Sequence, residues 1–315
     1  MLAYRTHFCA GLTLAVLALS GLSGLSGCAS KNDSGAPSDA GAGGDTWVDI
    51  DAGSGPGLWA STALPAFDDA TTQHVLQVFQ KGQKLGNRTS TFAKVGDSIT
   101  SSQSYMVDLG DGDYTLGAFA ALKPEIDVFN SVMFDDNSNT FNHESLCGQS
   151  GMTTKDALAV PSPVILELDN LRPAYAVVMY GTDDMDIMDA RTFEANMNKL
   201  VDYLEAEGVV SAISTIPRRL EIPNGDQMVA AFNAAIRDVA TTRHLPLIDF
   251  YAATINLPNN GISDDDVHPS VETGADGGSL SCDFTPTGLK FGYNNRNLLT
   301  LQVLDRFRHI TGAAK

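Results

Sequence analysis

The chain has 315 residues, and its formal net charge at pH 7 is −18. Residues 1–27 carry only Arg5, and residues 29–57 carry Lys31 against five aspartates, which leaves −15 on the rest. An acidic surface of this size argues against nucleic acid and anionic polymers as partners.

The N-terminus indicates export. Arg5 is followed by the apolar run "GLTLAVLALSGLSGL" and then by "LSGC", which ends at Cys28. This pattern predicts a secretory signal over residues 1–27. "LSGC" resembles a bacterial lipobox, which implies cleavage before Cys28 and attachment of lipid to that residue. Ordinary signal cleavage nearby, with Cys28 incidental, is the alternative. No other stretch reaches the ~20 apolar residues of a spanning helix, so we expect a lipid-anchored protein of the bacterial cell envelope.

A linker and one domain follow. Residues 29–57 are mainly Gly, Ala, Ser, Asp and Pro, with almost nothing to bury. Such a composition does not offset the entropy lost on ordering, so we assign residues 28–58 to the lipidated cysteine and a flexible linker. The length of residues 59–315 suits a single domain.

Apolar strands and amphipathic helices alternate along the domain. Amphipathic helices are clearest at 191–207 and 225–241. The predicted strands lie at 91–96, 126–134, 174–181, 209–215 and 246–250. Strands that are apolar throughout, separated by amphipathic helices, indicate an α/β fold whose parallel sheet is covered on both faces.

Four polar stretches follow the predicted strands, where ligands of parallel sheets bind. They are "GDSIT" (96–100), "CGQSGMTT" (147–154), "YGTDD" (180–184) and "DDDVHPS" (264–270). Alone, the first is also typical of a capped strand-to-helix turn. Together, the four resemble the SGNH, or GDSL-like, serine hydrolase family. That resemblance implies a three-layer α/β/α, flavodoxin-like fold with a parallel central sheet.

The resemblance also implies a catalytic triad. It assigns the nucleophile to Ser98 and the last two triad places to Asp265 and His268. A serine hydroxyl is a poor nucleophile until a base takes its proton, and His268 suits that role. Asp264 and Asp266 are alternative partners for the histidine, although the Asp-x-x-His spacing favours Asp265.

The same resemblance assigns the oxyanion hole to the backbone N–H groups of Ser98 and Gly151 and to the residue at position 183. The family usually has asparagine there, whereas this chain has Asp183. An ionised carboxylate donates no hydrogen bond. A site weakened at this position keeps open a non-catalytic binding lipoprotein on the same scaffold.

Two cysteines remain in the domain, Cys147 and Cys282. An even pair in an oxidising compartment predicts a disulfide, with two buried free thiols as the alternative. The acidic clusters at 183–186 and 264–266 lack the spacing of an EF-hand and are interpreted as a solvated acidic rim. We therefore expect no metal and no organic cofactor.

These observations predict an exported, membrane-tethered serine esterase that contacts the membrane through its N-terminal lipid only. We expect it to be a monomer and to bind no nucleic acid. The expected substrate is a carboxylic ester, with O-acetyl groups of a carbohydrate, lipid esters and small acyl esters as candidates. An O-acyltransferase that uses the same triad is a further alternative.

Overall fold

The computed structural model describes residues 62–275 and 277–314. The predicted signal sequence, Cys28 and the whole of the predicted linker lie outside the described residues. Within these ranges, no helix combines the length and the apolar character needed to cross a bilayer.

Four parallel strands form the sheet, in the spatial order β1-β2-β3-β4. Their bounds are β1 (Arg88–Gly96), β2 (Pro173–Met179), β3 (Val210–Ser214) and β4 (Leu247–Ile248). Every residue of β2 and β3 is buried, as expected for strands covered on both faces. The predicted parallel sheet of an α/β fold is therefore confirmed.

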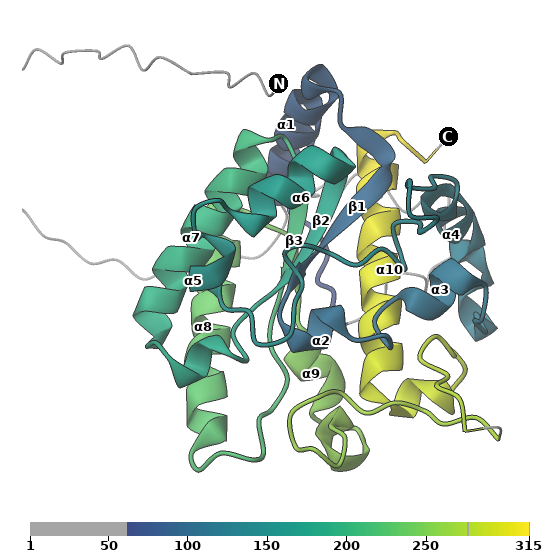
Figure 1. The fold of residues 1–315 in the computed structure, drawn as a ribbon, viewed down its shortest axis with the longest axis vertical. Helices are drawn as coiled ribbons and strands as arrows, with labels where there is room; N and C mark the ends of the chain where they lie inside the picture. The colour runs from purple at the N-terminus through teal and green to yellow at the C-terminus, as the bar shows by residue number, and fades with distance from the viewer. Residues whose placement is uncertain (1–61, 276, 315) are drawn as a thin grey trace, which may run out of the picture. The chain divides into compact units, whose positions relative to one another are not determined.

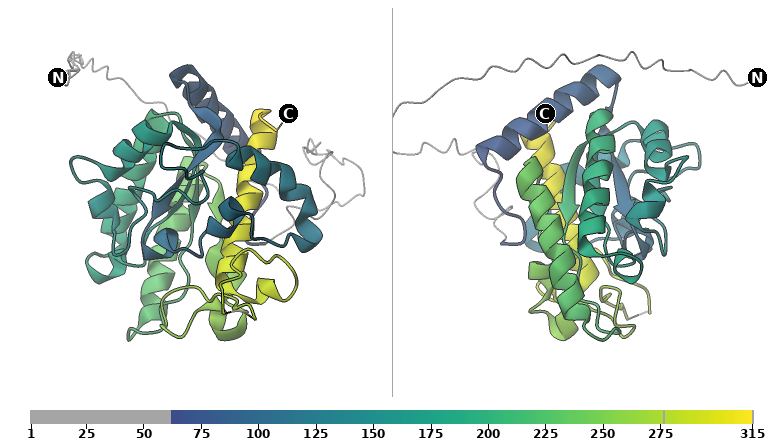
Figure 2. Two further views of the ribbon diagram at one scale, coloured as in Figure 1. Left: turned by 45° about the vertical axis from the view of Figure 1, so that its right-hand side comes forward. Right: turned by 90° about the vertical axis from the view of Figure 1, so that its left-hand side faces the viewer.

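Helices cover both faces of the sheet (Figures 1 and 2). On one side lie α7 (Ala190–Ala206) and α8 (Gly225–Arg243), which confirm the two predicted amphipathic helices. On the other side lie α1 (Asp69–Leu85) and α10 (Gly292–Thr311). There, the ring of Tyr175 on β2 stacks on Phe79 of α1 and on Phe307 of α10.

The remaining helices are shorter. They are α2 (Ser98–Ser101), α3 (Val107–Asp111), α4 (Lys123–Asn130), α5 (Thr154–Ala157), α6 (Pro163–Leu171) and α9 (Phe250–Thr254). Four 3₁₀ turns complete the described elements: η1 (Gly117–Leu122), η2 (Asp184–Asp186), η3 (Pro258–Gly261) and η4 (Gly288–Lys290).

The strand predicted at 126–134 is wrong, because most of this segment belongs to α4. Pro124 occupies the first turn of that helix, a position that proline favours. Ile126 and Phe129 are three residues apart, so the helix buries both on one face. The edge of β1 is instead met by a loop: the N–H of Gly96 donates to the carbonyl of Cys147 at 3.0 Å.

The predicted disulfide is also wrong, because Cys147 and Cys282 are both buried free thiols in the described structure. The thiol of Cys147 lies at the end of β1, 3.5 Å from the hydroxyl of Ser145. The thiol of Cys282 lies 3.4 Å from the side-chain amide of Asn297 on α10. Each thiol thus has its own polar neighbour, and burial raises the pKa of both well above the usual range.

Candidate active site

Ser98 is the first residue of α2, and a single residue, Asp97, separates it from β1. The carboxylate of Asp97 caps this helix by accepting a hydrogen bond from the N–H of Ile99 at 3.1 Å. A Cβ atom at position 96 would overlap the hydroxyl of Thr100 and the carbonyl of Met179, so only glycine fits the tight exit from the strand. The turn leaves Ser98 partly exposed, while its two neighbours are buried.

The structure brings Ser98, His268 and Asp265 together. The hydroxyl of Ser98 lies 2.9 Å from Nε2 of His268. Nδ1 of the same ring lies 2.7 Å from a carboxylate oxygen of Asp265. These two hydrogen bonds place the imidazole between a hydroxyl and a carboxylate, which is the arrangement of a nucleophile, a base and an orienting acid.

The loop that carries the histidine also fixes the aspartate. Asp265 accepts hydrogen bonds from the backbone N–H groups of Val267 and His268 and from the hydroxyl of Ser263. Partial burial alone would raise the pKa of Asp265, but these hydrogen bonds outweigh it and hold the pKa well below its usual range. The carboxylate beside the imidazole is therefore ionised, and it belongs to Asp265 rather than to Asp264 or Asp266.

Ser98 and Gly151 are the two residues whose backbone N–H groups are predicted to bind the oxyanion. Gly151 has φ of +75°, a backbone conformation that residues with a Cβ atom rarely adopt. Within the described residues, its N–H has no hydrogen-bond partner. The turn that precedes it is held by the hydroxyl of Tyr180, which donates to the carbonyl of Cys147 at 2.6 Å.

Asp183 lies close to the N–H of Ser98. Burial raises the pKa of Asp183, and the charge of Asp186 adds to this effect. The charges of Arg219 and His268 and the N–H of Ser98 act in the opposite direction, but the net shift is upward. One of its carboxylate oxygens is buried without a hydrogen-bond partner. A carboxyl group in this environment holds a proton more readily than an exposed aspartate does.

A sequence model of the GDSL-like Lipase/Acylhydrolase family matches residues 95–273, more than half of the chain. The chain belongs to this family. The GDSL-like chain is therefore an ester-hydrolysing enzyme, and the resemblance stated from its four motifs is confirmed.

Solved structures of esterases and lipases are similar to this GDSL-like enzyme at low sequence identity. A carbohydrate esterase family 3 protein from Talaromyces cellulolyticus is 18% identical, with a TM-score of 0.45; the match covers 69% of this chain and 98% of that one. An acetyl esterase mutant with an acetate ion is 18% identical, with a TM-score of 0.46 and the same coverage. A GDSL-like lipase from Bacteroides thetaiotaomicron is 19% identical, with a TM-score of 0.38, over 50% of this chain and 74% of that one. No curated protein matches the chain.

Two further aspartates of this GDSL-like enzyme, Asp97 and Asp184, are buried near the site. The interpretation of 183–186 as a solvated acidic rim is therefore wrong at Asp184, which is fully buried. Burial raises the pKa of Asp97 to about 7, and the nearby charge of Asp183 adds to the shift. Burial likewise raises the pKa of Asp184 to about 6, although Asp184 accepts a hydrogen bond from the N–H of Thr154 at 2.9 Å. The sequence signal for each aspartate was its place in a glycine-containing turn at the end of a strand. Asp97 directly follows Gly96, and Asp184 lies three residues after Gly181.

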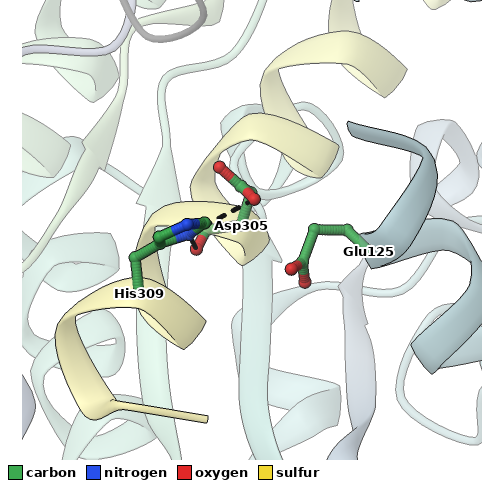
Figure 3. A group of neighbouring side chains, drawn as sticks. All are labelled: Glu125, Asp305 and His309. Atoms are coloured by element: carbon green, nitrogen blue, oxygen red, sulfur yellow. Dashed lines mark hydrogen bonds and ion pairs between the residues drawn. The ribbon is translucent and has the colours of Figure 1, made fainter. Parts of the chain in front are cut away.

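Away from this site, one group in the described residues offers three potential metal ligands: Glu125, Asp305 and His309 (Figure 3). The guanidinium of Arg308 lies 2.7 Å from the Glu125 carboxylate and already supplies a positive charge. Nδ1 of His309 lies 2.9 Å from the backbone carbonyl of Asp305, so this nitrogen carries a proton. The group is therefore better described as an ion-paired cluster that joins α4 to α10.

Proposed function

We propose that this enzyme hydrolyses a carboxylic ester through an acyl-enzyme formed on Ser98. The observation that carries the proposal is the chain of two hydrogen bonds from Ser98 through His268 to Asp265, at 2.9 and 2.7 Å. In this mechanism, the Ser98 hydroxyl attacks the ester carbonyl carbon while Nε2 of His268 takes its proton. Asp265 keeps the other ring nitrogen protonated and stabilises the imidazolium that forms.

The tetrahedral intermediate then collapses to the acyl-enzyme. His268 returns the proton to the alcohol oxygen, which leaves as the free alcohol. Water next attacks the acyl-enzyme with His268 again acting as the base, and the acid is released. If a hydroxyl compound replaced water in this second step, the same residues would transfer the acyl group instead of hydrolysing it.

The negative oxygen of the intermediate requires hydrogen-bond donors. We assign this role to the N–H groups of Ser98 and Gly151. We assign the third position to Asp183 in its protonated form, in which the carboxyl O–H donates. A neutral carboxylic acid serves as an oxyanion donor elsewhere in enzyme chemistry. Ionised Asp183 would instead repel the oxyanion and attract the Ser98 N–H to itself.

A fluorophosphonate probe tests the nucleophile. The probe should label the wild-type protein at Ser98, and Ser98→Ala should lose both labelling and more than about 10³-fold of its turnover of p-nitrophenyl acetate. Ser131→Ala, a change at an exposed serine on the C-terminal side of α4, serves as the matched control. A binding lipoprotein without catalysis would neither react with the probe nor hydrolyse the ester.

We further propose that the enzyme is tethered to the bacterial cell envelope through lipid on Cys28. The support is the lipobox-like "LSGC" after an apolar segment. Cells fed a labelled fatty acid should incorporate it into the wild-type chain, and Cys28→Ala should abolish incorporation and release the protein from the membrane fraction. Equal membrane association of both forms would contradict lipid anchoring.

A further inference from the structure

Arg219 belongs to the segment that follows β3, and its side chain reaches the turn that follows β2. Its Nη1 donates to the backbone carbonyl of Thr182 at 2.7 Å, and Thr182 directly precedes Asp183. The same nitrogen donates to the carboxylate of Asp186 at 3.0 Å. The side chain of Arg219 is only 10% exposed. A planar guanidinium that binds acceptors on both sides of Asp183 fixes the conformation of the turn that carries this residue.

The rest of the guanidinium and the next residue make further contacts. Nε of Arg219 donates to the carboxylate of Glu221 at 2.6 Å, and Nη2 contacts the same carboxylate. The backbone N–H of Leu220 donates to the carbonyl of Asp266 at 2.8 Å, two residues before His268. The segment after β3 therefore contacts the loop of the proposed base as well as the turn after β2.

Arg219 is also the main positive charge that acts on Asp183. Burial raises the pKa of Asp183, and the charge of Arg219 is the strongest influence that lowers it. The charge of His268 and the N–H of Ser98 lower the pKa less, and the charge of Asp186 raises it. The ionisation of Asp183 therefore depends on a balance in which Arg219 opposes burial.

Two more acidic side chains, Asp97 and Asp184, belong to this balance. The charge of Asp183 raises the pKa of both, and their charges disfavour the ionisation of Asp183 in return. Among the cations, His268 gains and loses its proton near neutral pH, whereas an arginine stays charged throughout. Arg219 is thus the one of these two cations whose effect on Asp183 does not change with pH.

We propose that Arg219 is a positioning residue that controls when Asp183 carries a proton, because it holds the turn of this carboxyl group and keeps a constant positive charge near it. The inference rests on the proposed function, in which the protonated form of Asp183 donates to the oxyanion. Combined with that donor role, Arg219 sets the upper end of the pH range in which the enzyme is active.

The direct test is the titration of the Asp183 carboxyl group. Its ¹³C resonance is followed by NMR in the full chain without substrate and is assigned by its loss in Asp183→Asn. Arg219→Gln removes the charge but keeps an amide that can donate to the Thr182 carbonyl. The titration midpoint of Asp183 should move to higher pH in this variant, by about one unit or more. An unchanged midpoint would overturn the proposal.

The matched control is Arg218→Gln. Arg218 is the preceding residue, but its guanidinium pairs with Asp226, at 2.7 and 2.6 Å. Loss of this charge should leave the titration midpoint of Asp183 where it is in the wild type. An equal shift in both glutamine variants would overturn a specific role of Arg219.

Two further variants separate charge from shape and do not depend on how well Arg219→Gln folds. Arg219→Lys keeps the charge but loses the forked donor, so the midpoint should stay near the wild-type value while kcat decreases. Asp186→Asn, at an exposed position, removes a negative charge and should move the midpoint to lower pH. A midpoint that rises in Asp186→Asn, or that rises as much in Arg219→Lys as in Arg219→Gln, would overturn the proposal.

A kinetic measurement separates this inference from the proposed function. The ratio of kcat/KM for Asp183→Asn to kcat/KM for its Asp183 parent is measured against pH with p-nitrophenyl acetate, with Arg219 present and with Arg219→Gln in both chains. The pH at which this ratio rises should increase in the Arg219→Gln pair, in step with the NMR midpoint. A midpoint that moves while the ratio does not depend on pH would support control of the proton by Arg219 and contradict the donor role of Asp183.

Discussion

Asp183 affects both the hydrogen bonding of the site and the ionisation of the acidic groups around it. Its carboxyl group interacts with the N–H of Ser98, one of the donors assigned to the oxyanion. Asp97 and Asp184 are buried nearby, and each has one carboxylate oxygen without a hydrogen-bond partner. Ionisation of all three carboxyl groups is unfavourable in this poorly solvated region, because each negative charge raises the free energy needed to ionise the next group.

The substitution Asp183→Asn should raise ester turnover at neutral pH by about tenfold or more. An amide donates to the oxyanion without needing a proton, and removal of a single oxyanion donor typically costs ~10²–10³ in turnover. The gain should shrink as the pH falls, because Asp183 then becomes protonated and donates through its own O–H. Steady-state kinetics from acidic to neutral pH measure this trend. Lower activity of Asp183→Asn at every pH would mean that the carboxylate has a positive role.

A second residue-scale prediction concerns stability. Burial raises the pKa of Asp97 to about 7, far above its unfolded value near 4, so the folded state binds a proton more tightly than the unfolded state does. The resulting stabilisation is complete below about pH 4 and is lost as the pH rises to about 7. Asp97→Asn cannot titrate but retains a side-chain oxygen to cap α2. The free energy of unfolding of the wild type, relative to this variant, should therefore fall between pH 4 and 7 in denaturant titrations. A constant difference across this range would contradict the shift.

At the scale of elements, α10 holds the short helix of the nucleophile in place. Arg296 of α10 donates to the carbonyl of Ile99 at 2.6 Å and to the hydroxyl of Thr100 at 2.7 Å. Its guanidinium stacks on the ring of Tyr105 at 3.7 Å. Tyr293, one turn earlier on α10, donates to the same Ile99 carbonyl at 3.2 Å. A four-residue helix thus gains a fixed orientation from a twenty-residue one.

Replacing Arg296 by lysine should disturb this orientation. Lysine keeps the charge but loses the planar, forked donor that reaches two acceptors at once. We expect a loss of about 1–3 kcal/mol in the free energy of unfolding and a decrease in kcat that exceeds the change in KM, since Arg296 positions Ser98 without touching substrate. Arg191→Lys, at an exposed position of α7, is the matched control. An unchanged kcat in Arg296→Lys would remove its positioning role.

The sequence predicts a feature well when the residues that form it are close together in the chain, and poorly when they are far apart. Ser98 lies in a short motif at the end of a strand, and Asp265 and His268 lie three residues apart in one loop. The resemblance of these motifs to the family, rather than the sheet topology alone, implied that the three side chains meet. The segment 126–134 was ambiguous, because its apolar residues also fit helical spacing.

At the scale of the whole molecule, the two thiols give a direct test of how the chain is held together. Cys147 and Cys282 are buried and separately hydrogen-bonded, so both should resist alkylation in the native protein and react fully after unfolding without a reductant. Peptide mapping by mass spectrometry reports the modification of each site. A linked pair of peptides that appears only without reductant would restore the disulfide.

Both edges of the sheet are protected at the end where the site lies. β4 at one edge has only two residues. At the other edge, the loop beside β1 supplies a backbone acceptor to Gly96, and the hydroxyl of Ser145 donates to the carbonyl of Lys94 at 2.6 Å. Exposed strand edges are templates on which other chains add strands and aggregate. A loop in place of an edge strand therefore does two things here: it leads into the turn that carries Gly151, and it keeps strands of neighbouring molecules from adding to this end of the sheet.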